Sequence, residues 1–138
     1  MIVADTSAVL ALIDRSDRHH RKLRRLFERD PAAWILPSAI LSEVDYLVGA
    51  HVGARAQDAF LRDLRDGAFS VAWGDEKILV EAVAIHMKYA SLRLGLVDAL
   101  VIATCVRVRA VAIATLDVKH FGTVAIPGTP KLYPRDLA

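Results

Sequence analysis

Short apolar runs rich in β-branched residues alternate along the chain with longer segments in which apolar residues recur every three or four positions. The short runs predict strands, because buried strands of a parallel sheet need apolar side chains on both faces. The last run is the weakest prediction, since three prolines lie between residues 126 and 134. The predicted strands are residues 2–4, 34–36, 69–72, 111–114 and 131–133.

The longer segments predict helices, and turn residues mark several of their ends. Pro37 and Ser38 can start one helix, and Gly67 can end another. Gly74 followed by Asp75 can end a strand and cap the next helix. Strands that alternate with helices in this way indicate an α/β protein with a parallel sheet. The predicted helices are residues 7–13, 18–28, 38–50, 55–65, 76–89 and 98–109.

Length and composition predict one globular domain over residues 1–138. Hydrophobic residues make up 54% of the chain and charged residues 25%, which allows a substantial core. The most apolar run, residues 99–106, is too short to span a bilayer, and no basic leader precedes the first strand. We therefore expect a cytoplasmic protein with no membrane contact. Cys105, Trp34 and Trp73 are all expected to serve packing.

Four carboxylates lie where apolar runs give way to helices. Asp5 and Asp117 follow predicted strands, and Asp98 opens a predicted helix. Glu43 lies one turn inside the helix predicted over residues 38–50, where its small and apolar neighbours indicate that its side chain points inward. Ligands of open α/β sheets bind beyond the carboxyl ends of the strands, so these acids are placed to form one site.

Carboxylates beside an apolar core cost several kcal/mol to desolvate unless a cation compensates their charge. Four of them predict a hard divalent cation, Mg²⁺ with Mn²⁺ as a substitute, and a metal-dependent nuclease. Each acid taken singly has another explanation. Asp5 and Asp98 can be helix caps, Glu43 can be an exposed helix residue, and Asp117 can form a turn. The prediction therefore depends on the set.

The histidines offer no rival chemistry in the sequence. His51, His86 and His120 have no evident partner for the acid–base pairing that metal-free ribonucleases use. His19 and His20 are adjacent and point to different faces of a helix. One cysteine and the lack of a spaced histidine or cysteine pair argue against zinc.

The net charge is only +2, but basic residues concentrate between positions 15 and 25, where Asp17 is the only acid. Leu23, Leu26 and Phe27 form a narrow apolar stripe there at helical spacing. This segment is either a solvated helix face or a surface that attracts phosphate. The candidate RNA-binding residues are Arg18, Arg21, Lys22, Arg24 and Arg25.

Four segments together resemble the PIN-domain ribonucleases, and specifically the VapC toxins of bacterial toxin–antitoxin pairs. They are DTSAVLAL, the glutamate of PSAILSEVDYLV, DALVIATC and TLDVKHF. The resemblance covers essentially the whole chain and implies a PIN domain, a parallel five-stranded sheet flanked by helices on both faces. It also implies that Asp5, Glu43 and Asp98 bind metal, with Asp117 as a fourth acid acting through water. Thr6, Ser7 and Thr115 match the hydroxyl positions that hydrogen-bond these acids or their waters, although caps and turns explain them equally.

The resemblance further implies a Mg²⁺-dependent endoribonuclease toxin that cleaves tRNA or the sarcin–ricin loop of ribosomal RNA. It implies a homodimer and a small VapB-like antitoxin whose C-terminal segment lies in a groove between the early helices, with an arginine inserted among the acids. Apolar residues available for that groove include Leu41, Tyr46, Leu47 and Phe60.

Three other functions stay open from the residues alone. A haloacid-dehalogenase-type phosphatase also has an aspartate after its first strand, but it needs a second aspartate two residues later, where this chain has Ser7. A catalytically silent PIN-like RNA-binding module would have broken acids, and these acids are intact. A protein-interaction module would not need the acid set.

Overall fold

Five parallel strands form a single sheet in the order β3-β2-β1-β4-β5. The computed structural model describes residues 1–138. β1 lies at the centre of the sheet, where Val3 is opposite Ile35 on one side and Ile113 on the other. All five strands occur where the sequence predicts them. They are β1 (Ile2–Ala4), β2 (Trp34–Pro37), β3 (Ser70–Ala72), β4 (Ala112–Ala114) and β5 (Lys131–Tyr133).

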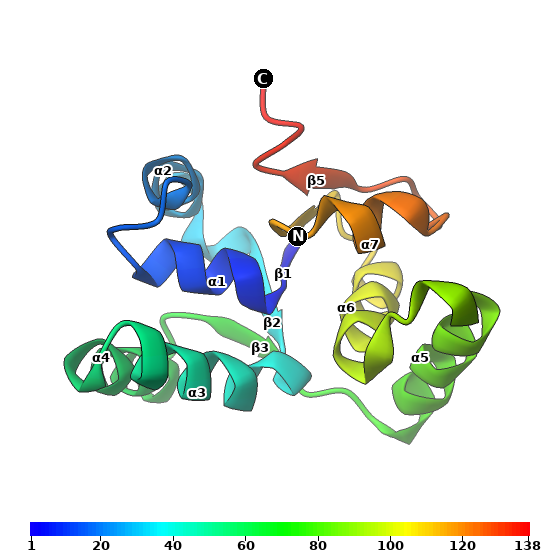
Figure 1. The fold of residues 1–138 in the computed structure, drawn as a ribbon, viewed down its shortest axis with the longest axis horizontal. Helices are drawn as coiled ribbons and strands as arrows, with labels where there is room; N and C mark the ends of the chain where they lie inside the picture. Colours follow the sequence, from blue (N-terminus) through cyan, green and yellow to red (C-terminus); the bar gives the residue numbers. More distant parts are fainter.

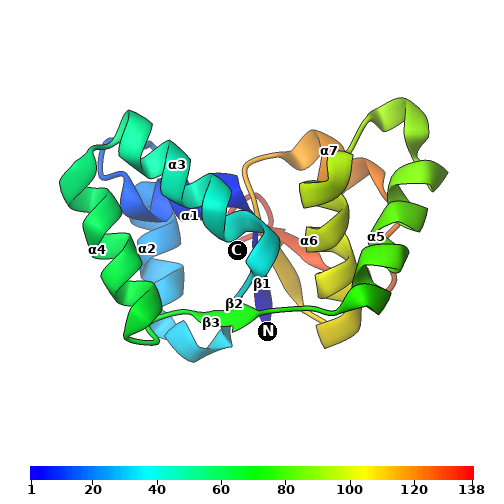
Figure 2. The same ribbon diagram turned by 90° about the horizontal axis from the view of Figure 1, so that it is seen from below.

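Helices cover both faces of the sheet, as the predicted fold class requires. Helices α1 to α4 gather on one side, and α5 to α7 on the other (Figures 1 and 2). Short 3-10 turns at Pro31–Ala33, Ser38–Ile40 and Ala90–Leu92 connect some of these elements. The helices are α1 (Thr6–Ile13), α2 (His20–Arg29), α3 (Leu41–His51), α4 (Ala54–Arg65), α5 (Glu76–Lys88), α6 (Gly95–Val108) and α7 (Val118–Thr123). No helix is long and apolar enough to cross a membrane.

Two helix predictions needed correction. The helix predicted to begin at Asp98 begins at Gly95, so Asp98 lies inside the first turn of α6. Helix α7 was not predicted, because its six residues contain too few apolar positions to show a helical period. Its start depends instead on the cap that Asp117 provides.

The core surrounds the central strands and consists mainly of aliphatic and aromatic side chains. Trp34 is fully buried and packs edge-on against Phe27, and Cys105 is buried, as predicted. The packing prediction for Trp73 is wrong, since this residue follows edge strand β3 and is 75% exposed. The expectation that Phe60 lines a docking groove is also wrong, because its ring is only 2% exposed and packs beside Phe69.

Candidate active site

Asp5 connects the end of β1 to the start of α1 and is almost fully buried, with 5% of the residue exposed. Its Oδ1 accepts hydrogen bonds from Ser7 Oγ at 2.7 Å and from the Ala8 backbone N–H at 3.2 Å. Its Oδ2 accepts a hydrogen bond from Thr115 Oγ1 at 2.7 Å. Asp5 therefore caps α1, and both of its oxygens are held in fixed positions.

Burial raises the pKa of Asp5 from its ordinary value of 3.8 to about 6. The hydrogen bonds from Ser7, Thr115 and Ala8 lower this pKa, but they do not offset the loss of water. The nearby charge of Asp98 raises it further. At neutral pH the carboxylate is ionised in a position where its charge is unfavourable, which is the condition that a bound cation relieves.

The same hydroxyl groups join the ends of β1 and β4. Ser7 Oγ accepts a hydrogen bond from the Leu116 N–H at 2.9 Å, and Thr115 Oγ1 accepts one from the Asp117 N–H at 2.9 Å. Asp5 and Asp117 are thus linked through Thr115. The hydrogen bonds expected for Ser7 and Thr115 are present in the structure, whereas the buried Thr6 Oγ1 has no hydrogen-bond partner.

Asp98 lies close enough to the other three acids for their charges to affect one another. Its pKa is raised, first by partial burial and then by the neighbouring charges of Asp117 and Glu43. The contact with His120 opposes these effects. Because Asp98 also raises the pKa of Asp5, the structure brings all four predicted acids within one electrostatic neighbourhood.

The side chain of Glu43 does not point inward as expected. It lies in the first turn of α3, and its side chain is exposed rather than directed into the core. The small residues on that helix face indicated an inward side chain. The buried residues of α3 are instead Val44 and Val48, which lie on a different face of the helix from Glu43. The charge of Glu43 nevertheless acts on Asp98.

His120 is the residue that sequence reasoning missed. Its Nδ1 lies 2.9 Å from Asp98 Oδ2 and 3.1 Å from Asp117 Oδ2. The prediction that His120 has no partner is therefore wrong. The signal available in the sequence was its position three residues after Asp117, which places both on one side of a helix start. Its contact with Asp98, 22 residues away, depends on the fold.

The donor set fits a divalent cation. Asp98, Asp117 and His120 each offer one ligand atom, and these three atoms lie within 4.8 Å of one another. No lysine or arginine forms a salt bridge with any of the four acids. Carboxylate oxygens are the ligands that Mg²⁺ and Mn²⁺ accept in proteins.

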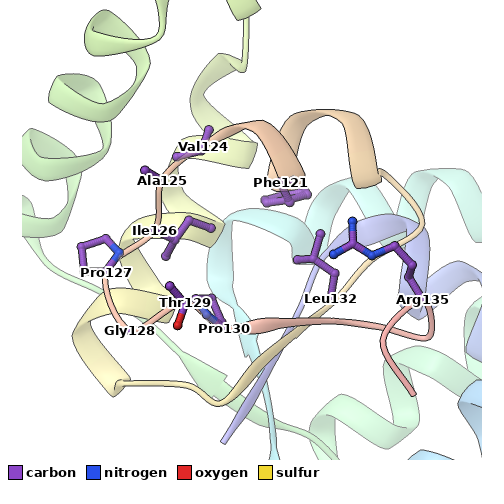
Figure 3. A pocket seen from close by; sticks show the side chains of 11 residues that line it. Phe121, Val124, Ala125, Ile126, Pro127, Gly128, Thr129, Pro130, Leu132 and Arg135 are labelled. Atoms are coloured by element: carbon purple, nitrogen blue, oxygen red, sulfur yellow. The ribbon is translucent and has the colours of Figure 1, made fainter. Parts of the chain in front are cut away.

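A cavity of about 430 Å³ lies elsewhere, between α7 and the segment that leads into β5. Its lining includes Phe121, Ile126 and Leu132, with Arg135 at one end (Figure 3). None of the four acids lines it. Arg135 is engaged in a salt bridge with Asp136 at 2.8 Å. The cavity is therefore separate from the acidic site.

Comparison with known proteins identifies the family. The profile of the PIN domain matches residues 2–126. Ribonuclease VapC26 of Mycobacterium tuberculosis is 32% identical over 123 residues, which are 89% of this chain and 91% of that protein. The chain therefore belongs to the PIN-domain family, as the sequence motifs predicted.

Solved structures agree on the fold. Mycobacterium tuberculosis VapC20, described as a sarcin–ricin loop cleaving toxin, has a TM-score of 0.77 at 21% identity, covering 90% of this chain and 97% of that one. A toxin–antitoxin complex from Klebsiella pneumoniae has a TM-score of 0.69 at 22% identity, covering 93% of this chain and 94% of that one. The five-stranded PIN architecture predicted from the sequence is confirmed.

Proposed function

We propose that this chain is a divalent-metal-dependent endoribonuclease, the toxin of a VapBC-type toxin–antitoxin pair, which hydrolyses phosphodiester bonds in structured RNA and so inhibits translation. The observation that carries the proposal is the cluster of ligand atoms from Asp98, Asp117 and His120, which lie within 4.8 Å of one another. The charge of Asp98 also raises the pKa of the buried Asp5, and the charge of Glu43 raises the pKa of Asp98. The 32% identity to a ribonuclease over most of both chains supports the same class of enzyme.

The four acids would act together on the ion. The ligand atoms of Asp98 and Asp117 lie within 4.8 Å of each other, with Asp5 from the end of β1 and Glu43 from α3 completing the proposed set. When bound, Mg²⁺ or Mn²⁺ would supply the positive charge that stabilises the transition state and would make water more acidic. Ser7 and Thr115 fix both oxygens of Asp5, so this part of the site is arranged before RNA arrives.

We propose tRNA or ribosomal RNA as the substrate. Because these RNAs are cytoplasmic, we also propose that the protein acts in the cytoplasm. The description of VapC20 as a toxin that cleaves the sarcin–ricin loop makes ribosomal RNA one of the two targets to test first. Sequencing the RNA 5′ ends produced in cells after brief induction distinguishes the two, because cleavage of each RNA creates its own new end.

Incubation of the purified protein with total RNA, with and without EDTA, tests the proposed activity. A generic phosphatase substrate is included as a matched control for phosphomonoester chemistry. We expect RNA cleavage that EDTA abolishes and excess Mg²⁺ restores, with no phosphatase activity. RNA cleavage that persists in EDTA contradicts the proposal.

Helix α2 and the turn before it, which carries Arg18, support a role in binding RNA. Arg18, Arg21, Lys22 and Arg25 are exposed, while the buried Leu23 and Leu26 attach the helix to the core. His20 Nδ1 lies 2.9 Å from the Ala11 carbonyl oxygen and connects α2 to α1, the helix that Asp5 caps. Arg24 forms an i,i+4 salt bridge with Glu28 at 2.7 Å, so its charge is partly compensated. The exposed cations form a surface that can attract the phosphate backbone.

Replacing Arg21, Lys22 and Arg25 by glutamine should flatten the dependence of log affinity for RNA on log salt. Each neutralised phosphate releases condensed counterions, so the slope should change by about one unit for each phosphate that the variant no longer neutralises. The affinities are measured with Asp5→Asn protein to prevent cleavage. Arg109→Gln with Lys131→Gln is the matched control. These exposed cations lie before β4 and in β5, whereas α2 packs through Phe27 against Trp34 of β2, on the other side of β1. An unchanged slope in the α2 variant shows a merely solvated helix face.

We also propose a small VapB-like antitoxin as a partner, which the Klebsiella pneumoniae toxin–antitoxin complex supports. Tyr46 on α3 is 72% exposed and is the most accessible of the apolar residues expected to form its groove. Leu41 and Leu47 are partly buried beside it, and Phe60 belongs to the core.

Co-expression with the product of the adjacent small open reading frame should give a complex that co-purifies and suppresses toxicity. Tyr46→Ala should weaken that complex about tenfold or more, because exposed aromatic residues commonly provide much of the energy of an interface. Exposed Val111→Ala, at the amino edge of the sheet, should leave it unchanged. Full toxicity upon co-expression with the wild-type chain contradicts the pairing.

We also propose that the chain forms a homodimer. Val80, Val83 and Met87 form an exposed apolar stripe along α5, at positions one turn apart. A stripe on one helix can pack against its own copy around a two-fold axis. Sedimentation of the purified chain tests this proposal, with a monomer at micromolar concentrations as the opposing result.

A further inference from the structure

The imidazole of His120 lies where two carboxylates meet. Its Nδ1 is 2.9 Å from Asp98 Oδ2 and 3.1 Å from Asp117 Oδ2, and its side chain is 25% exposed. One nitrogen and two carboxylate oxygens therefore converge on one point at the border between protein and solvent. Neither the other histidines nor any lysine or arginine forms a salt bridge with these two acids.

Two contacts fix the position of this ring. Asp117 Oδ1 accepts a hydrogen bond from the His120 backbone N–H at 3.0 Å, so the carboxylate that meets the ring also caps the helix carrying it. The next residue, Phe121, is buried and anchors α7 to the core. The ring is thus held at the acids by the same local structure that starts α7, which is the arrangement expected of a preorganised ligand.

We propose that His120 Nδ1 is a metal ligand together with Asp98 and Asp117, and that this mixed carboxylate–imidazole site makes the enzyme prefer Mn²⁺ to Mg²⁺. This inference rests on the metal-dependent function proposed above. Mg²⁺ is a hard cation that takes oxygen ligands, whereas imidazole nitrogen raises the relative affinity for first-row transition ions. Neutral imidazole can carry its proton on Nε2, which leaves the Nδ1 lone pair free to bind the ion.

A positioning role makes a different prediction. If His120 only donated a hydrogen bond and oriented the two carboxylates, its loss would weaken the binding of both ions to a similar degree. A ligand role weakens Mn²⁺ binding much more than Mg²⁺ binding. The ratio of the two affinities therefore separates the roles, and it can be measured without RNA and without catalysis.

Calorimetric titration of Mn²⁺ alone and Mg²⁺ alone into wild-type and His120→Ala proteins tests the inference. We expect Mn²⁺ affinity to fall at least about tenfold and the ratio of Mn²⁺ to Mg²⁺ affinity to fall with it. His51→Ala is the matched control, because His51 is exposed at the end of α3 and makes no salt bridge. This control should bind both ions like the wild type.

Pulsed electron paramagnetic resonance of wild-type protein with bound Mn²⁺ gives a second readout that does not depend on how the variant folds. Direct ligation predicts modulation from a coordinated ¹⁴N nucleus, and His120→Ala should lose it. Absence of a nitrogen signal in the wild type, or an affinity ratio that His120→Ala leaves unchanged, overturns the inference alone. If neither ion binds the wild type, the metal-dependent function fails as well.

Discussion

Asp98→Asn lowers the rate of RNA cleavage by about a thousandfold in our account, because it removes the charge through which the acids are connected. Losing one group that stabilises transition-state charge typically costs about 10²–10³ in rate. Asp98 is the acid whose field reaches Asp5 and is itself influenced by Asp117 and Glu43. Single-turnover cleavage at saturating Mg²⁺ measures the effect.

The chain provides a matched control for this substitution. Asp75 caps α5 by accepting a hydrogen bond from the Ile78 N–H, much as Asp5 caps α1, but it pairs with Arg107 at 2.9 Å. Asp75→Asn should therefore cleave RNA at nearly the wild-type rate. If the Asp98→Asn protein cleaves RNA as fast as this control, the proposed assignment of the active site is wrong.

Substitution of the other acids should also lower the rate of RNA cleavage. Asp5→Asn and Glu43→Gln should also abolish cleavage. Asp117→Asn distinguishes two roles. A loss as large as that for Asp98→Asn indicates the direct metal binding inferred above for Asp117, whereas a smaller loss indicates the action through water that the family resemblance implies.

Asp5→Asn should raise the free energy of unfolding of the metal-free protein at pH 7 by about 3 kcal/mol, even as it abolishes cleavage. The pKa of Asp5 is raised from 3.8 to about 6 in the folded protein, and each pKa unit corresponds to about 1.4 kcal/mol. Asparagine keeps the shape of the side chain and can still hydrogen-bond the hydroxyls of Ser7 and Thr115. It removes the buried charge.

The raised pKa of Asp5 also determines how the free energy of unfolding changes with pH. Between pH 3.8 and about 6 the folded protein holds a proton on Asp5 that the unfolded chain has released. The free energy of unfolding of the wild type therefore falls as pH rises through this window, and the full destabilisation is present above it. The difference between wild type and Asp5→Asn should therefore shrink as the pH falls from about 6 to 3.8, and below pH 3.8 both proteins carry a neutral side chain at this position.

Urea denaturation in EDTA at several pH values measures these free energies. Saturating Mg²⁺ should recover stability in the wild type but not in Asp5→Asn, because the ion binds only the folded site. The difference in free energy of unfolding between the wild type and Asp5→Asn should be smaller at pH 4 than at pH 7. An equal difference at the two pH values would contradict the raised pKa of Asp5.

The strands and two of the acids were predictable because local sequence determines them. Asp5 and Asp117 directly follow apolar runs, and the end of a strand in a parallel sheet is a position that sequence pattern marks well. The exposed side chain of Glu43 was not predictable in the same way. Which face of α3 meets the core depends on how this helix packs against its neighbours, and the moderate apolarity of both faces left that undetermined.

His120 shows most clearly what local pattern leaves out. Its helix is too short for hydrophobic periodicity, and one of its two partners comes from α6, 22 residues earlier. Trp73 gives the reverse case, since a large aromatic residue beside a strand usually packs, but an edge strand leaves it without a neighbour to cover it. Both outcomes depend on contacts between distant segments rather than on local sequence.

The position of a bound ion shows whether the predicted acids form a metal site. Crystals of the wild-type protein grown or soaked with Mn²⁺ can be measured at the manganese absorption edge, where the anomalous signal locates the ion. The account predicts a peak bounded by Asp5, Asp98 and Asp117. A peak only elsewhere, in protein that cleaves RNA with Mn²⁺, would contradict it.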